Sequence, residues 1–406
     1  MELYCPLILD GANGTELQKR GYDGSVCTEA WVLEHPEVMK TLQEEYVKAG
    51  SDVVYAPTFG ANRVKLEENG IFNQVGDFNK RLVTISKEAV AGGNALVAGD
   101  IATTGKFLAP VGDVTFADLY DIYHEQAEAL EEAGVDMFVI ETIMTVPDAR
   151  AALLAVKDVS DKPVLVSFTS DENGRTLTGS DVRAALVIMQ GMGIDAFGLN
   201  CSTGPSEMLE QAKRLSDLAE VPLAIKPNAG LPKSVNGKTL YDCPPDEFAK
   251  HTKEFSELGG ALFGGCCGTG PEHIAKIAPE LHDFELRKPD PQYRDKIVCA
   301  TEKDVFILEP GIKAGEIIDC GPDLEDKIRK ANKSDSQIIT IRISCEPDLD
   351  EFEAAQYAIR KPLCIVCDDA ALLNETLTLY QGRALYAGNL SDEELAPMVY
   401  RYGLII

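Results

Sequence analysis

Short apolar segments alternate with longer amphipathic segments along the first 285 residues of the chain. The residues of the apolar segments are aliphatic or β-branched on both faces, which is typical of strands buried on both sides. The segments between them place apolar residues at three- and four-residue steps, and several begin with Pro and end at Gly, which predicts helices. The predicted strands occupy 7–12, 52–58, 95–101, 137–142, 163–169, 196–202, 222–230 and 261–268.

Eight strand–helix units in this length predict an α/β fold of the closed (β/α)8 type, a TIM barrel. An open, doubly wound sheet is the alternative, but the glycine-rich GxGxxG that follows its first strand is missing. The polar residues also favour the barrel, because they stand at the carboxyl ends of the predicted strands, where barrel active sites are built. These residues are Asp10, Thr58, Asp100, Glu141, Asn200, Cys201, Asn228, Cys266 and Cys267.

A charged segment with two prolines, ELRKPDPQYRDK, follows the eighth unit. It predicts a linker over 286–296, between a barrel over 1–285 and a smaller α/β domain over 297–406. The last part of the chain again alternates strand-like and helical segments. They are too few to close a second barrel, so we expect a domain that resembles half of one.

The composition excludes some classes of partner. The chain has 38 basic and 66 acidic residues and a net charge of −28, so it repels nucleic acids and anionic membrane surfaces. No apolar run reaches the length of a membrane span, and no basic region precedes the short apolar run near the N-terminus, so we expect a cytoplasmic protein. In a reducing compartment the 11 cysteines are expected to be thiols or metal ligands rather than disulfides.

Three cysteines stand at predicted strand ends: Cys201 in GLNCSTGP, and Cys266 with Cys267 in GGCCGTGPEHI. Neighbouring residues of a regular strand point to opposite faces, so Cys266 and Cys267 can face one metal ion only if the backbone turns between them. The glycines that flank the pair permit such a turn. Three thiolates and one open position are typical of a catalytic zinc site, because a structural site fills all four positions.

The ligand set predicts the chemistry. Three thiolates leave a zinc centre with a net charge of −1, which makes it a poor Lewis acid for hydrolysis. It can still bind a substrate thiol and lower the thiol pKa from about 8.5, so that a nucleophilic thiolate forms. We therefore predict alkyl transfer to a thiol. The alternative is a non-catalytic scaffold, in which a fourth protein ligand closes the zinc site.

The other cysteines are interpreted as small core residues, including the CxxC formed by Cys364 and Cys367. The histidines show no ligand spacing, and His273 is expected in the helix that follows the Cys266–Cys267 loop.

Further residues at strand ends suit an amino-acid substrate. Backbone amides near Gly14 and Thr15 lie at a predicted helix start, where a carboxylate binds well. Asp10 and Glu141 offer two carboxylates for an ammonium group, and Asn200 is placed in the same substrate site. Asp and Thr are also common N-cap residues, so either residue type alone also fits a structural role.

The motifs DGANGT, APTFGAN, GLNCSTGP, KPNAGLP and GGCCGTGPEHI, with the strand end Glu141-Thr142, resemble the homocysteine S-methyltransferase family. The similarity is greatest to the homocysteine-binding domain of its cobalamin-dependent methionine synthases, and it runs in order over residues 5–285. The resemblance implies that homocysteine sulfur is the fourth zinc ligand during turnover. It also implies zinc ligation by Cys201, Cys266 and Cys267, with Asn228 in the fourth position when substrate is absent, and binding of the amino-acid end by Asp10, Thr15 and Glu141.

KPNAGLP resembles the cobalamin-dependent branch, which implies methylcobalamin as the methyl donor. The chain lacks a DxHxxG corrinoid motif, so we expect a separate corrinoid protein or domain to carry the cobalamin. The alternatives are a free donor (S-methylmethionine, a betaine-like compound or methyltetrahydrofolate) or another thiol acceptor. The tail from PLCIVCDD onward weakly resembles the first half of the pterin-binding barrel of methionine synthases. It departs from that pattern at residues 366–369, so we do not expect it to bind folate.

Overall fold

The computed structural model describes residues 6–109, 111–235, 238–282, 287, 289–309 and 311–406. Contacts between Cα atoms divide the chain into two compact units. The barrel unit comprises Met1–Leu177, Asp195–Ser216 and Val221–Asp290, and the tail unit comprises Thr178–Ile194, Asp217–Glu220 and Pro291–Ile406. Residues 286 and 288 of the predicted linker lie outside the described residues, and the boundaries at 285 and 297 stay a prediction.

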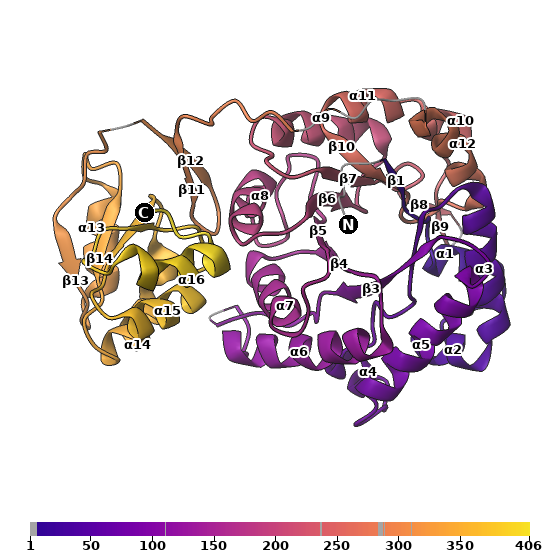
Figure 1. The fold of residues 1–406 in the computed structure, drawn as a ribbon, viewed down its shortest axis with the longest axis horizontal. Helices are drawn as coiled ribbons and strands as arrows, with labels where there is room; N and C mark the ends of the chain where they lie inside the picture. Colours follow the sequence, from indigo (N-terminus) through magenta and orange to yellow (C-terminus); the bar gives the residue numbers. More distant parts are fainter. Residues whose placement is uncertain (1–5, 110, 236–237, 283–286, 288, 310) are drawn as a thin grey trace. The chain divides into compact units, whose positions relative to one another are not determined.

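The barrel unit contains an eight-stranded parallel sheet in the order β1-β10-β7-β6-β5-β4-β3-β2. A parallel bridge between Leu9 and Val53 joins its two ends, so the sheet closes. The (β/α)8 fold and all eight predicted strands are confirmed (Figure 1). The strands are β1 (Leu7–Ile8), β2 (Val53–Tyr55), β3 (Leu96–Ala102), β4 (Met137–Ile143), β5 (Val164–Phe168), β6 (Ala196–Asn200), β7 (Leu223–Lys226) and β10 (Gly260–Phe263).

Helices connect the strands of the barrel unit, and a short hairpin interrupts the connection after β7. Helix α6 shows how the sequence sets these ends: Thr115 and Asp118 form a capping box at its start, and Gly134 ends it with φ of 75°. The helices of the unit are α1 (Gly14–Lys19), α2 (Thr28–Glu34), α3 (Pro36–Ala49), α4 (Arg63–Glu68), α5 (Val75–Val90), α6 (Phe116–Ala133), α7 (Val146–Val159), α9 (Pro205–Ser216), α10 (Pro245–Ala249), α11 (Thr252–Glu257) and α12 (Pro271–His282). The hairpin consists of β8 (Lys233–Val235) and β9 (Lys238–Leu240).

Alternate residues of the barrel strands form a buried cluster, as expected for strands with period two. Small alanines and larger side chains together fill this cluster, so the carboxyl ends of the strands lie above a packed core rather than an open channel. Its members are Leu9, Val53, Tyr55, Ala98, Met137, Val139, Leu165, Ala196, Ala224, Ala261 and Leu262.

The tail unit contains a four-stranded parallel sheet in the order β13-β14-β15-β16, which is the strand order of half a barrel. Buried side chains of the β11–β12 hairpin pack with those of the sheet, namely Cys299 and Leu308 with Ile338, Cys364 and Leu385. The hairpin therefore covers one face that an isolated half barrel would expose. The elements are α8 (Val182–Gly191), β11 (Ile297–Ala300), β12 (Val305–Leu308), β13 (Ile317–Asp319), α13 (Leu324–Asn332), β14 (Ile339–Arg342), α14 (Pro347–Ala355), η1 (Gln356–Ala358), β15 (Leu363–Val366), α15 (Ala370–Leu379), β16 (Leu385–Tyr386) and α16 (Asp392–Tyr402).

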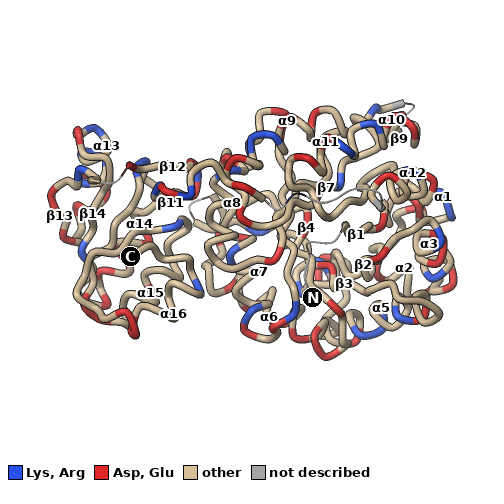
Figure 2. Tube along the Cα trace, turned by 45° about the horizontal axis from the view of Figure 1, so that its top comes forward, with Lys and Arg blue, Asp and Glu red and all other residues tan. Residues whose placement is uncertain are grey.

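Acidic positions occur along both units, interspersed with fewer basic ones (Figure 2). Among the described residues, no helix combines the length and the hydropathy that crossing a membrane requires.

Candidate metal centre

Three thiols lie together at the carboxyl end of the barrel. The Sγ atoms of Cys201, Cys266 and Cys267 are all within 4.8 Å of one another, and those of Cys201 and Cys267 are 4.0 Å apart. Cys201 directly follows β6, and the pair follows β10. Within the described ranges this is the one group of three or more His, Cys, Asp or Glu side chains close enough to hold a metal ion. The structure thus brings together the three cysteines that the sequence identified.

The loop that carries Cys266 and Cys267 is flanked by Gly265 and Gly268. At both positions neighbouring side chains leave no space for a Cβ atom. A Cβ on Gly265 would lie 2.6 Å from Cγ2 and 2.7 Å from Cβ of Thr269. Gly268 has φ of 84°, and a Cβ there would lie 2.5 Å from Cγ of Tyr241. The glycines are therefore required by contacts as well as by backbone freedom.

Cys201 lies in a strained turn. Cys201 and Ser202 have φ of 63° and 60°, which non-glycine residues rarely adopt. Backbone hydrogen bonds hold this turn: Cys201 N donates to Lys226 O at 3.2 Å, and Thr203 N donates to Cys201 O at 2.7 Å. Strain of this kind, about 1–2 kcal/mol per residue, often occurs at functional sites. Here it turns the chain away from strand geometry at the predicted ligand.

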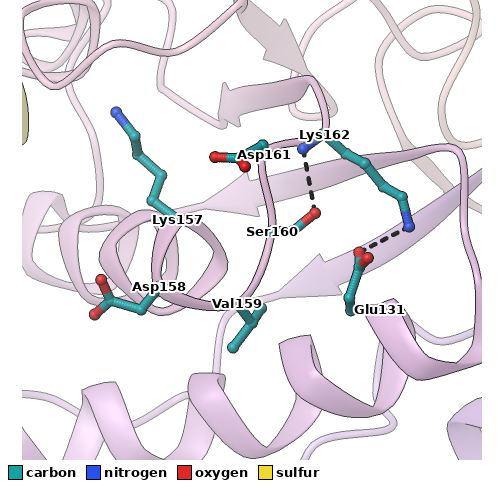
Figure 3. Close-up of a pocket in the computed structure, with 7 residues that line it drawn as sticks. All are labelled: Glu131, Lys157, Asp158, Val159, Ser160, Asp161 and Lys162. Atoms are coloured by element: carbon teal, nitrogen blue, oxygen red, sulfur yellow. Dashed lines mark hydrogen bonds and ion pairs between the residues drawn. The ribbon is translucent and has the colours of Figure 1, made fainter.

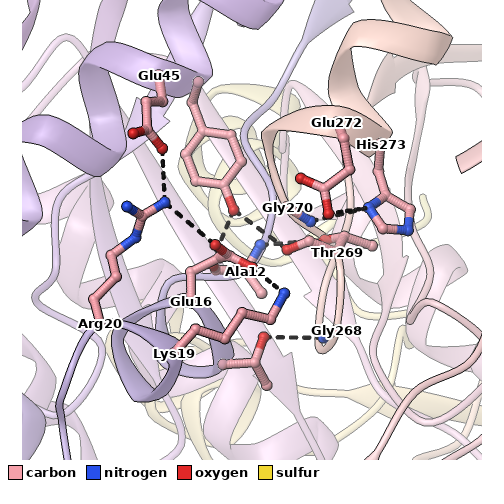
Figure 4. Close-up of polar contacts among 12 residues, drawn as sticks. Ala12, Glu16, Lys19, Arg20, Glu45, Gly268, Thr269, Gly270, Glu272 and His273 are labelled. Atoms are coloured by element: carbon pink, nitrogen blue, oxygen red, sulfur yellow. Dashed lines mark hydrogen bonds and ion pairs between the residues drawn. The ribbon is translucent and has the colours of Figure 1, made fainter. Parts of the chain in front are cut away.

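Hydrogen bonds tie the cysteine loop to the loop after β1 (Figure 4). The Thr269 hydroxyl donates to Cys266 O at 2.7 Å and accepts from Ala12 N at 3.2 Å. Gly268 N donates to the Thr15 hydroxyl at 3.0 Å. The side chain of Thr15 therefore stabilises the cysteine loop, which is a contact that the sequence did not predict.

The three thiols shift one another's pKa values. Hydrogen bonds from Cys201 and Cys266 lower the pKa of Cys267 to about 3. The contacts of Cys266 with Cys201 and Cys267, together with burial, raise its own pKa well above the usual value. A hydrogen bond with Cys266 lowers the pKa of Cys201, but Cys267 and burial outweigh it and raise this pKa to about 11. A thiolate that already accepts from two thiols suits a soft divalent cation, which would replace both protons.

Asn228 carries a buried amide oxygen that has no partner in the described part of the chain, and its backbone lies next to the cysteine turns. Its side chain is 1% exposed, and its Oδ1 has no hydrogen-bond partner among the described residues. Its backbone adjoins both cysteine turns, because Asn228 N donates to Thr203 O and Ala229 N donates to Cys267 O, each at 2.9 Å. Three sulfurs and one unpartnered buried amide oxygen fit a tetrahedral zinc ion.

A buried group of charged residues, the charged cluster, lies beside these turns and consists of Asp10, Asp100, Glu141 and Lys226. Lys226 Nζ is 3.3 Å from Asp10 Oδ1 and 3.6 Å from Glu141 Oε2. It also lies 3.5 Å from the ring centroid of Tyr55. Sequence reasoning placed all three carboxylates at strand ends but missed Lys226, although it is the one charged residue in the apolar segment 222–230.

Burial and neighbouring charges set the protonation of the charged cluster. Burial raises the pKa of Asp10 to about 6, although Lys226 opposes the shift. Burial and the charge of Glu141 raise the pKa of Asp100 well above its usual value. Burial lowers the pKa of Lys226, but Glu141, Tyr55 and Asp10 outweigh it and hold this pKa well above the usual value.

Asn200 links the charged cluster to the thiols. Its Oδ1 accepts from Thr142 N at 2.9 Å and from the Ser167 hydroxyl at 2.7 Å. Its Nδ2 donates to the Thr142 hydroxyl at 2.7 Å and lies 3.9 Å from Cys266 Sγ. Thr142 has φ of 56°, a conformation that is unusual for a β-branched residue. Asn200 therefore holds the strained residue next to Glu141.

The structure also shows the positions of the other residues that the sequence analysis named, including the remaining cysteines. Gly14 and Thr15 are the first two residues of α1, and His273 lies in α12 as expected. Cys299, Cys364 and Cys367 are buried, as predicted for core cysteines. The core interpretation is wrong for Cys345, which is exposed because it lies in the loop after β14. Cys27, Cys243 and Cys320 are partly buried, and Cys5 lies outside the described residues.

A pocket of about 540 Å³ lies elsewhere in the barrel unit, between the end of α7 and the start of β5 (Figure 3). Lys162 Nζ pairs with Glu131 Oε2 across it at 2.8 Å. This loop precedes a strand, so it belongs to the amino end of the barrel, where stability rather than catalysis is the usual role. The pocket contains none of the predicted site residues.

Comparisons with known proteins agree with this geometry. The sequence model of the family described as homocysteine S-methyltransferase matches residues 7–281. Proteins named methionine synthase from Mycobacterium leprae and Mycobacterium tuberculosis are 33% and 32% identical to the chain over 291 and 305 residues. These alignments cover 67% and 70% of this chain but 24% and 25% of the relatives, so the chain spans about a quarter of their length.

Solved structures agree on the fold. The metallated form of the homocysteine methyltransferase MmuM from Escherichia coli superposes with a TM-score of 0.58 and 23% sequence identity. The superposition covers 68% of this chain and 96% of that structure.

Proposed function

The chain belongs to the homocysteine S-methyltransferase family, and on that premise we propose that it transfers a methyl group to the thiol of L-homocysteine, giving methionine. One observation carries this proposal: three thiols lie within 4.8 Å of one another at the carboxyl end of a closed barrel. Beside them lie an unpartnered buried amide oxygen and a cluster of buried carboxylates. The set offers places for a metal-bound thiol and for the charged end of an amino acid.

We propose that Cys201, Cys266 and Cys267 hold zinc, with Asn228 in the fourth position until the acceptor arrives. When bound, zinc would lower the pKa of the acceptor thiol, so that a thiolate is available at neutral pH. The chain supplies the geometry, because the hydrogen bond from Thr269 to Cys266 O fixes the cysteine loop. Free thiols persist in a reducing cytoplasm, which is the compartment proposed for this reaction.

The amino-acid end of the acceptor is proposed to bind in the charged cluster. Asp10 and Glu141 accept hydrogen bonds from its ammonium, and backbone amides near Gly14 and Thr15 receive its carboxylate. Asn200 positions this end of the site through its bonds to Thr142. Residues from the ends of β1, β4 and β6 thereby orient the acceptor sulfur toward the incoming methyl group.

The proposed donor is methylcobalamin carried by a partner protein or domain. Four exposed large apolar side chains of the barrel unit support a protein-borne donor, because each lies in the segment that directly follows the carboxyl end of a barrel strand. Exposed apolar residues grouped on one side of a protein mark interaction surfaces. They are Phe59, Val111, Leu177 and Leu231.

A methyl-transfer assay tests the proposal. Zinc-loaded protein is mixed with L-homocysteine and with methylcobalamin, S-methylmethionine, betaine or methyltetrahydrofolate in separate reactions, and methionine is quantified by mass spectrometry. We expect methionine with methylcobalamin and none with Cys267→Ala. Methionine with a free donor alone would reassign the donor. No methionine with any donor would favour the zinc-stabilised scaffold.

A further inference from the structure

Lys226 ends β7 with its ammonium group inside the charged cluster. Its side chain is 5% exposed, and Nζ lies 3.3 Å from Asp10 Oδ1 and 3.6 Å from Glu141 Oε2. The face of the Tyr55 ring covers the same ammonium at 3.5 Å from its centroid. These two carboxylates are the groups proposed to bind the ammonium of the acceptor. A cation of the chain therefore already occupies that position.

One of the two carboxylates retains a buried oxygen without a hydrogen bond to the described part of the chain. Glu141 Oε2 is buried without a hydrogen-bond partner among the described residues, since 3.6 Å is too long for a hydrogen bond. Asp10 Oδ2 is already engaged by Tyr55 N at 2.8 Å. Buried charges are costly unless they are paired, and Lys226 supplies a partner without any ligand. An entering acceptor therefore meets two carboxylates that already share one cation, and of their buried oxygens Glu141 Oε2 is the one without a hydrogen bond from the described residues.

We propose that Lys226 is a specificity-determining residue of the acceptor site, which makes an ammonium group on the acceptor dispensable. The inference rests on the proposed methyl transfer to a thiol and extends its substrate class to mercapto-carboxylates with or without an α-amino group. In each case the thiol proton leaves to solvent and a sulfur–carbon bond forms. The bond between methyl and donor breaks, and its electron pair stays on the donor.

The test compares L-homocysteine with its des-amino analogue, 4-mercaptobutanoate, on the zinc-loaded full chain. Two readouts are measured for each thiol: the dissociation constant by titration calorimetry without donor, and kcat/KM with methylcobalamin. We expect wild type to prefer L-homocysteine by less than about tenfold. Lys226→Met should raise this preference by a further factor of about ten or more, because it leaves two buried carboxylates that only the ammonium of homocysteine can pair.

Two variants serve as controls. Lys226→Arg keeps the cation and should keep the wild-type preference, and Lys253→Met changes an exposed lysine of α11 and should also leave it unchanged. If Lys226→Met does not fold, the wild-type ratio decides: a preference for L-homocysteine below about tenfold supports the inference, and a larger preference overturns it.

The outcomes separate the two proposals. Binding of both thiols with a preference that Lys226→Met leaves unchanged would overturn the role of Lys226 alone. If neither thiol binds zinc-loaded wild type, the proposed function fails and the inference fails with it.

Discussion

Adding one methyl group at Gly265 should weaken the metal centre without removing any ligand. The Cβ of Gly265→Ala would lie 2.6 Å from Cγ2 and 2.7 Å from Cβ of Thr269, and still closer to its hydroxyl. Thr269 is fully buried and hydrogen-bonded to Cys266 O and Ala12 N, so it cannot turn away freely. Overpacking of this kind costs about 1–3 kcal/mol, and each lost hydrogen bond adds about 1 kcal/mol. We therefore expect a loss of about 2–4 kcal/mol.

The assay for Gly265→Ala combines urea unfolding of the metal-free protein with zinc competition against a chromophoric chelator. Displacement of the loop that carries Cys266 should weaken zinc binding by about fivefold to thirtyfold, because we expect half of that energy to act on the ligand geometry. The matched control is Gly76→Ala in α5, where no atom lies within 4 Å of the added Cβ. It should be neutral or stabilising by up to about 1 kcal/mol. A Gly265→Ala protein that keeps zinc affinity within about twofold and stability within about 0.5 kcal/mol would refute the reasoning.

Three further changes test the site. Replacing Cys201, Cys266 or Cys267 with Ala should abolish zinc retention, measured by elemental analysis after dialysis. Circular dichroism should still show a folded barrel for each variant. Unfolding of all three variants would mean that the metal is structural. Because Cys201 has φ of 63°, metal-free Cys201→Gly should be more stable to urea than Cys201→Ala by about 1 kcal/mol, and equal stability would contradict the strained turn. Burial raises the pKa of Asp10 to about 6, so the folded state binds the proton of Asp10 more tightly than the unfolded state does. The contribution of Asp10 to the free energy of unfolding should therefore fall by about 3 kcal/mol as the pH rises from the unfolded-state pKa of Asp10 through 6. Asp10→Asn should remove that fall from urea unfolding measured across pH, and parallel profiles for the two proteins would be inconsistent with it.

The pattern of apolar segments was sufficient to predict the barrel, because each strand is buried on both faces and each helix shows its own period. The same pattern placed Cys201, Cys266 and Cys267 at strand ends, and parallel strands bring such ends to one side. It did not reveal that Cys201 and Thr142 adopt positive φ, because nothing in a non-glycine residue type marks that conformation. Tertiary hydrogen bonds impose it.

Lys226 and Thr15 show a second limit of sequence reasoning. Lys226 stands in an apolar strand, but its partners Asp10 and Glu141 come from strands 216 and 85 residues away in sequence, so no local pattern reveals the pairing. Thr15 was predicted from its place at a helix start, whereas its hydroxyl contacts Gly268 of the cysteine loop. The sequence identified where the site lies, and long-range packing decided which of its polar groups are already paired.

Zinc-edge X-ray absorption on the zinc-loaded full chain, before and after addition of L-homocysteine, tests the central claim most directly. We predict a change from three sulfur ligands and one light atom to four sulfur ligands, because the acceptor thiol replaces the oxygen of Asn228. A coordination shell that L-homocysteine leaves unchanged would contradict thiol activation at Cys201, Cys266 and Cys267.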